Sequence, residues 1–138
     1  MKINEAFEKI TSEMGLTYIF DDIARINVRA DNAPSYPALL RQFPEVWNED
    51  ENYKTHYRIY RNLLLFFVDK CPLDFGTPKE AAPIADNMME LWFRFRSKLV
   101  ALGFNPEQVG GIDVVDKLDV NLAGISVNIR LKEIIACI

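Results

Sequence analysis

Apolar residues recur at steps of three and four near the start of the chain, which predicts an amphipathic helix. Ile3, Phe7, Ile10 and Met14 fall on one face of this helix, and glutamate and lysine residues occupy much of the remaining surface. Gly15 follows the last apolar position, and glycine readily adopts the left-handed conformation that ends a helix. We therefore expect the chain to open with a helix that packs one face against a core.

The segment from Thr55 to Pro72 reads THYRIYRNLLLFFVDKCP and predicts one long strand. Polar and bulky residues alternate in its first half, and six apolar residues follow from Leu63 to Val68. Alternation is typical of a strand with one exposed face, whereas a continuous apolar run is typical of a strand covered on both faces. The run is far shorter than the roughly 20 residues of a membrane-spanning helix. We therefore expect the first half to face solvent or a partner and the second half to lie inside the protein.

Shorter stretches of strand-like composition precede this long strand. Thr17–Phe20 and Arg25–Arg29 are predicted as strands, and so is Tyr36–Phe43, which has a proline near each of its ends. Trp47–Asn52 reads WNEDEN and is predicted as an acidic, polar connector. Because a strand lies on each side of this connector, the pattern predicts an antiparallel hairpin.

A second, longer helix is indicated by a start signal, an apolar stripe and a stop signal. The sequence TPKE, from Thr77 to Glu80, fits a capping box in which threonine caps the helix and proline takes its first position. Pro83 should kink the first turns or mark a later start. Gly103 suits the left-handed C-terminal position. The apolar stripe consists of Ile84, Met88, Leu91, Phe95, Leu99 and Leu102.

The last third of the chain contains a turn and a strand pattern. Asn105–Gly111 is predicted as a turn, and Asp113–Val120 fits either a strand or a loop. The stretch GISVNIRLKEI follows, with apolar residues from Ile125 to Leu131 at every second position and polar residues between them. A period of two predicts a strand with one face toward the core and one polar face.

The order of these elements predicts an α+β fold. We expect an antiparallel sheet of about four to six strands, with the long helix and the N-terminal helix packed on one face. Residues 1–138 suit a single domain with a real core. A composition of 49% hydrophobic and 26% charged residues is that of a globular chain.

The net charge, the N-terminal sequence and the cysteine content argue against several classes of protein. A formal net charge of −4 argues against a broad basic face for nucleic acid. The first fifteen residues lack the apolar core of a signal peptide, so a secreted protein is not expected. Cys71 and Cys137 are too few for a disulfide framework and are expected to be reduced, small apolar residues.

Motifs for catalysis or metal binding are absent from the sequence. His56 is the only histidine, and no nucleophile, phosphate-loop or zinc-ligand spacing accompanies it. Asp21-Asp22 and the acidic run Glu49–Glu51 could bind a divalent cation, but their spacing does not fit a calcium-binding loop, and solvated loop charges explain them better. The arginines of WFRFRSK point in different directions on a helix, which favours salt bridges over an RNA site. We therefore expect no catalytic, cofactor-binding or metal-binding residues, and a protein that is not an enzyme.

In their order, these segments resemble the tail-terminator and related minor tail proteins of long-tailed bacteriophages. That family shares an N-terminal helix, an aromatic-Pro-Ala strand after a loop and a long strand that ends in an apolar run and a proline. A helix across the sheet and a final alternating strand complete its pattern. The resemblance covers nearly the whole chain and rests on packing patterns rather than on chemical motifs. The matching segments here are Ile3–Met14, Tyr36–Leu40, Thr55–Pro72, Ile84–Leu102 and Leu122–Leu131.

This resemblance implies a structural role. Such subunits form a ring, commonly a hexamer, on the last ring of the tail tube, where they stop tube growth and offer a surface to the head connector. The implied partners are other copies of the chain, tail-tube proteins and head-connector proteins, without a membrane or specific nucleic-acid contact. The implied location is the virion tail or the cytoplasm of the bacterial host. No cofactor or catalytic residue is implied.

Tyrosine and arginine residues around the acidic connector are candidates for a subunit contact. Both residue types are enriched in interfaces. Trp47, Tyr53, Arg58 and Tyr60 are therefore predicted to contribute to a contact between subunits. The alternative explanation of these residues is an amphipathic strand in a monomeric protein, without a subunit contact.

Two other functions fit the same pattern. One is a small-ligand or enzymatic domain with a pocket between the long helix and the sheet, which a stabilising metabolite would reveal. The other is a regulatory module that binds a cellular protein through the segment Tyr36–Trp47. Such a module would be monomeric alone and would capture its partner.

Overall fold

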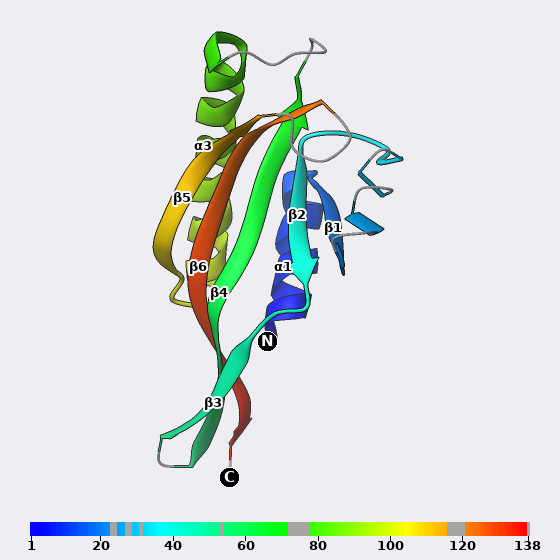
Figure 1. Cartoon of the computed structure of the whole chain (residues 1–138). Helices are drawn as coiled ribbons and strands as arrows, with labels where there is room; N and C mark the ends of the chain where they lie inside the picture. The colour runs from blue at the N-terminus through cyan, green and yellow to red at the C-terminus, as the bar shows by residue number, and fades with distance from the viewer. Residues whose placement is uncertain are drawn as a thin grey trace.

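The computed structural model describes residues 1–22, 25, 26, 29, 30, 32–52, 54–71, 78–115 and 121–137. Two long helices and six strands make up these residues, so the predicted α+β class is confirmed (Figure 1). The elements in chain order are α1 (Ile3–Met14), β1 (Thr17–Asp22), β2 (Ala38–Phe43), β3 (Trp47–Asn52), β4 (Thr55–Lys70), α3 (Pro78–Ala101), β5 (Glu107–Val115) and β6 (Leu122–Cys137).

The strands form one sheet in the order β1-β2-β4-β6-β5, and β3 pairs with β4 beyond the end of β2. All pairs are antiparallel except β1 with β2, which are parallel. The prediction of a purely antiparallel sheet is therefore wrong at this pair. The reason is the segment Arg25–Arg29, which was predicted as a strand. Its described residues are helical, and a parallel pair needs such a crossover.

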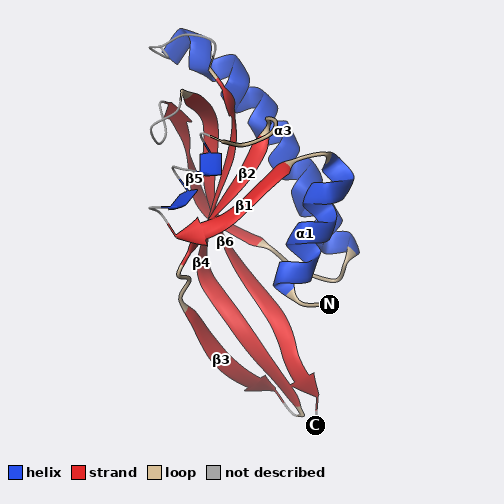
Figure 2. Ribbon diagram, turned by 90° about the vertical axis from the view of Figure 1, so that its right-hand side faces the viewer, coloured by secondary structure: helices blue, strands red, loops and turns tan. Residues whose placement is uncertain are grey.

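The two helices cover one face of the sheet, as predicted (Figure 2). Their apolar stripes meet the inward side chains of β4 and β6 in the main core. At its centre, the ring of Phe95 lies 5.0 Å from that of Phe7 and 5.6 Å from that of Phe67. Such edge-to-face aromatic pairs add to the stabilisation that burial alone gives.

A second, smaller core lies on the opposite face. Phe66 and Val68 of β4 pack there with Leu40 of β2 and with Ile26 and Ala30 from the crossover. The apolar run of β4 is therefore covered on both faces, as its composition predicts. The crossover is the layer that covers the second face.

Helix ends follow the predicted signals wherever these are described. Gly15 ends α1 with a φ of 69°, and Gly103 follows α3 with a φ of 96°. Both values lie in the left-handed region, which glycine adopts without a steric penalty. Pro78 is the first residue of α3, and Pro83 lies inside the helix. Thr77, the predicted cap, lies outside the described residues.

Two predicted loops are strands. Trp47–Asn52 forms β3, and the predicted turn Asn105–Gly111 contains the start of β5. In both cases pairing with a long neighbour, β4 or β6, overrides a polar or glycine-rich sequence. In the ambiguous stretch Asp113–Val120, residues 113–115 belong to β5, and residues 116–120 lie outside the described part.

One end of the sheet projects beyond the helices (Figures 1 and 2). There β3, the first part of β4 and the last part of β6 form a three-stranded extension. We call it the β-arm and define it as residues 47–52, 55–60 and 131–137. Only the base of the β-arm, at Tyr60, Leu131 and Glu133, packs against the helical body, so much of the first half of the long strand has an open surface.

Candidate functional site

The β-arm exposes apolar side chains that the core does not cover. All residues of β3 are exposed. Trp47 keeps 44% of its surface accessible, and Val46, which precedes it in the chain, is 76% exposed. Large apolar side chains that cluster outside a core mark interaction surfaces more often than scattered ones do.

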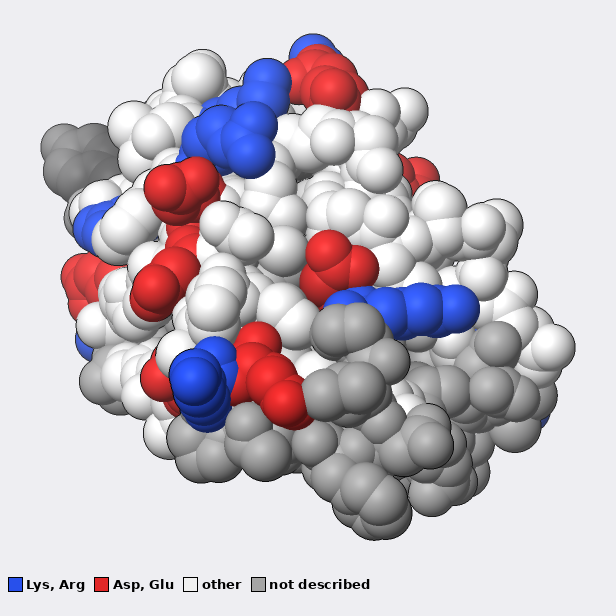
Figure 3. Space-filling view, turned by 90° about the horizontal axis from the view of Figure 1, so that it is seen from above, with Lys and Arg blue, Asp and Glu red and all other residues white. Residues whose placement is uncertain are grey.

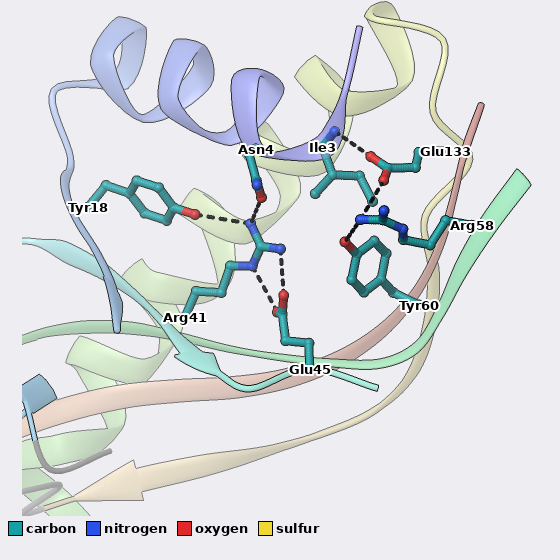
Figure 4. A network of polar contacts seen from close by, with 8 residues as sticks. All are labelled: Ile3, Asn4, Tyr18, Arg41, Glu45, Arg58, Tyr60 and Glu133. Carbon is teal, nitrogen blue, oxygen red and sulfur yellow. Dashed lines mark hydrogen bonds and ion pairs between the residues drawn. The ribbon is translucent and has the colours of Figure 1, made fainter. Parts of the chain in front are cut away.

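Arg58 lies at the centre of a cluster on one side of the arm. Its guanidinium lies 4.4 Å from the centre of the Trp47 ring, within the range of a cation–π interaction. Its Nη1 donates a hydrogen bond of 3.1 Å to the hydroxyl of Tyr60 and lies 3.5 Å from Oε1 of Glu133 (Figure 4). Strand register places Trp47 opposite Tyr60 and Glu49 opposite Arg58. The tryptophan is thus held in place by a charged neighbour.

Glu133 anchors this cluster to the body of the protein. It is only 4% exposed, and its Oε2 accepts a hydrogen bond of 2.8 Å from the backbone N–H of Ile3 (Figure 4). A carboxylate is favoured at this place because the first N–H groups of a helix lack partners and carry partial positive charge. Glu133 therefore ties the base of the arm to the start of α1.

The electrostatics keep Arg58 charged. The hydrogen bond to Tyr60 raises the pKa of the guanidinium, and the nearby carboxylates of Glu133 and Glu49 act in the same direction. An arginine is cationic at any physiological pH even without such help. The arm therefore offers a fixed positive charge beside an aromatic ring, and three carboxylates along β3.

Three of the four predicted contact residues come together in this cluster. Trp47 is its exposed member, and Arg58 is about one-third exposed. Tyr60 is buried in the main core, and its hydroxyl accepts the hydrogen bond that orients Arg58. Tyr53 lies outside the described residues.

Glu133 was missed by the sequence reasoning, although a signal was present. The inward positions of β6 continue by twos from Leu131 to Glu133. A charged residue at an inward position needs a buried partner. In this fold, Arg58 and the N-terminus of α1 are those partners.

A second buried polar cluster lies nearby, under α1. Arg41 is 1% exposed and makes a bidentate pair with Glu45, with distances of 2.8 and 2.6 Å. It also donates hydrogen bonds to the side-chain oxygens of Asn4, at 2.9 Å, and Tyr18, at 3.2 Å (Figure 4). The cluster joins α1, β1 and β2. Because its central ion pair is buried and the cluster links these three elements, we assign it a structural role.

Of the other candidate groups for chemistry, the two neighbouring aspartates form local ion pairs. Asp21 pairs with Arg29 at 3.3 Å, and Asp22 pairs with Arg25 at 3.7 Å. His56 Nε2 lies 3.9 Å from a carboxylate oxygen of Glu51. In the described ranges, no group of three or more histidine, cysteine, aspartate or glutamate side chains could hold a metal ion.

The surface cavities are small. One of about 270 Å³ lies beside β5 and is lined by Met89, Gln108, Gly111 and Ser126, among others. Drug-sized ligands typically occupy pockets of roughly 300–1,000 Å³. A wider hollow of about 440 Å³ lies along β1 and is lined by Tyr18, among others.

The end of the molecule opposite the arm carries mixed charge. Lysine and arginine side chains lie among aspartate and glutamate side chains in this view, and its described part shows no continuous basic area (Figure 3). Of the helices in the described ranges, none combines the length and apolar composition needed to cross a bilayer.

Comparison with protein families, with curated proteins and with solved structures yields no match to this chain. The geometry of the arm is therefore the main basis for a functional proposal.

Proposed function

We propose that this chain is the repeating subunit of a closed ring that ends the tail tube of a phage or prophage. The observation that carries the proposal is the β-arm, which extends past the helices and exposes Trp47 and its apolar neighbours. The chain's own core leaves this surface open, and exposed apolar surfaces of this kind often mark sites of interaction. In a ring, another copy of the chain covers this surface.

The shape of the subunit favours a repeating contact. The arm and the helical body are different surfaces, so an arm that docks on the next body makes a heterologous contact, which generates a ring when the rotation closes. In addition, β1 and β5 are the outer strands of the main path of the sheet, and among the described residues each has a strand partner on one side only. Free edges of this kind can pair with a neighbouring chain.

The place in the tail rests on the resemblance of the sequence to tail-terminator proteins. The test is electron microscopy of tail tubes mixed with the protein, using tubes from the phage or prophage whose genome encodes it. Rings that cap tube ends and stop further growth are expected. Rings that form but do not bind tube ends would support the closed ring and refute the tail role.

A second candidate function is the binding of a small ligand beside β5. The cavity there is lined by Met89 of α3 and by Gln108 and Gly111 of β5, among others. A ligand that binds only the folded state raises the melting temperature. A metabolite that raises it with saturation, and loses this effect in Gln108→Ala, would favour this candidate.

A further inference from the structure

The outward face of α3 carries an uncovered apolar strip. Phe93 and Val100 are 52% and 54% exposed. They are seven residues apart, which places them on the same side of the helix two turns apart. Ser97 lies between them, also exposed. We call this surface the α3 stripe and define it as Phe93, Arg94, Arg96, Ser97 and Val100.

Arginines flank the apolar strip of the α3 stripe on both sides, and the exposed Glu90 borders its N-terminal end. Helical geometry places Arg94 on one side of the apolar strip and Arg96 on the other. Neither arginine forms an ion pair with any described residue, whereas Lys98, one turn further on, pairs with Glu13 at 3.2 Å. An apolar centre with a charged rim is the usual anatomy of a protein–protein contact.

The β-arm carries the complementary features. Alternate residues of a strand share a face, so Glu49 and Glu51 lie on the same side of β3 as Trp47. Asp50 adds a third carboxylate on the other side. The nearby cation, Arg58, is already shared with buried Glu133. This side of β3 is therefore an exposed aromatic ring followed by excess negative charge.

We infer that β3 of one copy docks on the α3 stripe of the next copy. Trp47 covers Phe93 and Val100, and the carboxylates of Glu49 and Glu51 pair with the rim arginines. Complementary charges of this kind fix the register and suppress wrong partners. The inference deepens the proposed ring, on which it rests, by naming the two surfaces that meet.

Cysteine cross-linking tests this pairing directly. One copy carries Glu51→Cys and the other carries Ser97→Cys, both in a background of Cys71→Ala and Cys137→Ala. The two copies are mixed and mildly oxidised, and mass spectrometry identifies the linked peptides. A disulfide forms only when the two Cα atoms approach within about 4.4–6.8 Å. We expect heterodimers that contain the 51–97 link.

The matched control moves the second cysteine along the same helix. Ala82 is exposed like Ser97 and lies roughly 22 Å away along the axis, at 1.5 Å per residue. Ala82→Cys should give several-fold less heterodimer. Equal yields from both positions would overturn the inference.

Charge reversal gives an independent check. Arg94→Glu with Arg96→Glu should reduce the 51–97 link several-fold, because it opposes like charges across the contact. The exposed lysine of the first helical turn provides the control, and Lys79→Glu should leave the yield unchanged. Rings without the specific link would retain the proposed function and refute this pairing. A specific 51–97 link in a protein that forms no rings would support this pairing and refute the proposed ring.

Discussion

At the residue scale, two buried or half-buried guanidinium groups organise the polar side chains under α1 (Figure 4). Arg41 and Glu45 are shielded from solvent, whereas the cluster of Arg58 is partly open. An ion pair that is fully buried is costly to break, because the remaining charge has no water to solvate it. The two clusters therefore have different tasks: one supports the fold, and the other shapes a surface.

We expect a large loss of stability when the Arg41–Glu45 pair is broken by mutation. Glu45→Gln removes one charge and leaves the guanidinium buried, which should reduce the free energy of unfolding by about 3–5 kcal/mol. The matched control is Glu13→Gln, which breaks the exposed pair with Lys98 and should cost less than about 1 kcal/mol. Urea unfolding followed by circular dichroism measures both. Equal losses would contradict the structural role of the buried pair.

We expect the folded protein to lose stability at alkaline pH because Tyr18 is partly buried. Burial raises the pKa of its hydroxyl above the ordinary value of 10.0, although Arg41 acts in the opposite direction. The unfolded chain therefore loses this proton first as the pH rises. The stabilisation from Tyr18 is complete below a pH of about 10 and is lost as the pH rises through the pKa of the folded state. The free energy of unfolding should be measured at pH values below and above about 10. It should fall less steeply with rising pH in Tyr18→Phe than in wild type. Parallel dependences on pH in the two proteins would contradict this.

At the element scale, the sequence predicts the elements that have a strong period. The stripes of α1 and α3, the alternation of β6 and the apolar run of β4 all reflect burial that the structure confirms. β3 could not be predicted, because asparagine, glutamate and aspartate are poor strand formers and only pairing with β4 extends them. The helical crossover was missed because its short apolar pattern fits either state.

The candidate site was predictable only in part. Trp47 and Arg58 were chosen because aromatic and arginine residues are common in interfaces, and they do meet in the arm. Sequence could not show that Glu133, more than seventy residues later, completes their cluster. Strand order decides that contact, and strand order depends on the whole sheet.

Gly124 predicts a backbone constraint at the start of β6. Its φ is 156°, and a Cβ atom at this position would overlap the carbonyl oxygen of Phe67 in β4. Gly124→Ala should therefore cost about 1–3 kcal/mol of stability. Gly110→Ala is the control, because a Cβ there meets nothing within 4 Å. Thermal and urea unfolding should separate the two variants, and equal stability would contradict the close approach of β6 to β4.

At the scale of the whole molecule, the sheet extends beyond the helices, and this separates a buried core from an exposed arm. The helices and the crossover bury both faces of the central sheet, while the β-arm beyond its base projects past the helices. The arm is linked to the body through Glu133, so a partner that binds the arm is positioned relative to the whole subunit. Such a geometry suits a subunit whose task is assembly.

The arm predicts a selective assembly defect. Trp47→Ala removes an exposed ring and should leave the fold intact, yet it should shift the protein from rings to monomers at the same concentration. Ile112→Ala removes a side chain that is also exposed, on β5 away from the arm, and should assemble like wild type. Negative-stain images show the rings, and circular dichroism checks the fold. Loss of rings in both variants, or in neither, would contradict the role of the arm.

The most direct test of the account is light scattering behind a sizing column over a wide range of concentration. A closed ring predicts a mass that settles at a fixed whole multiple of 15.9 kDa and does not grow further. A mass that remains at 15.9 kDa at the highest concentration, and also in the presence of tail tubes, would contradict the ring.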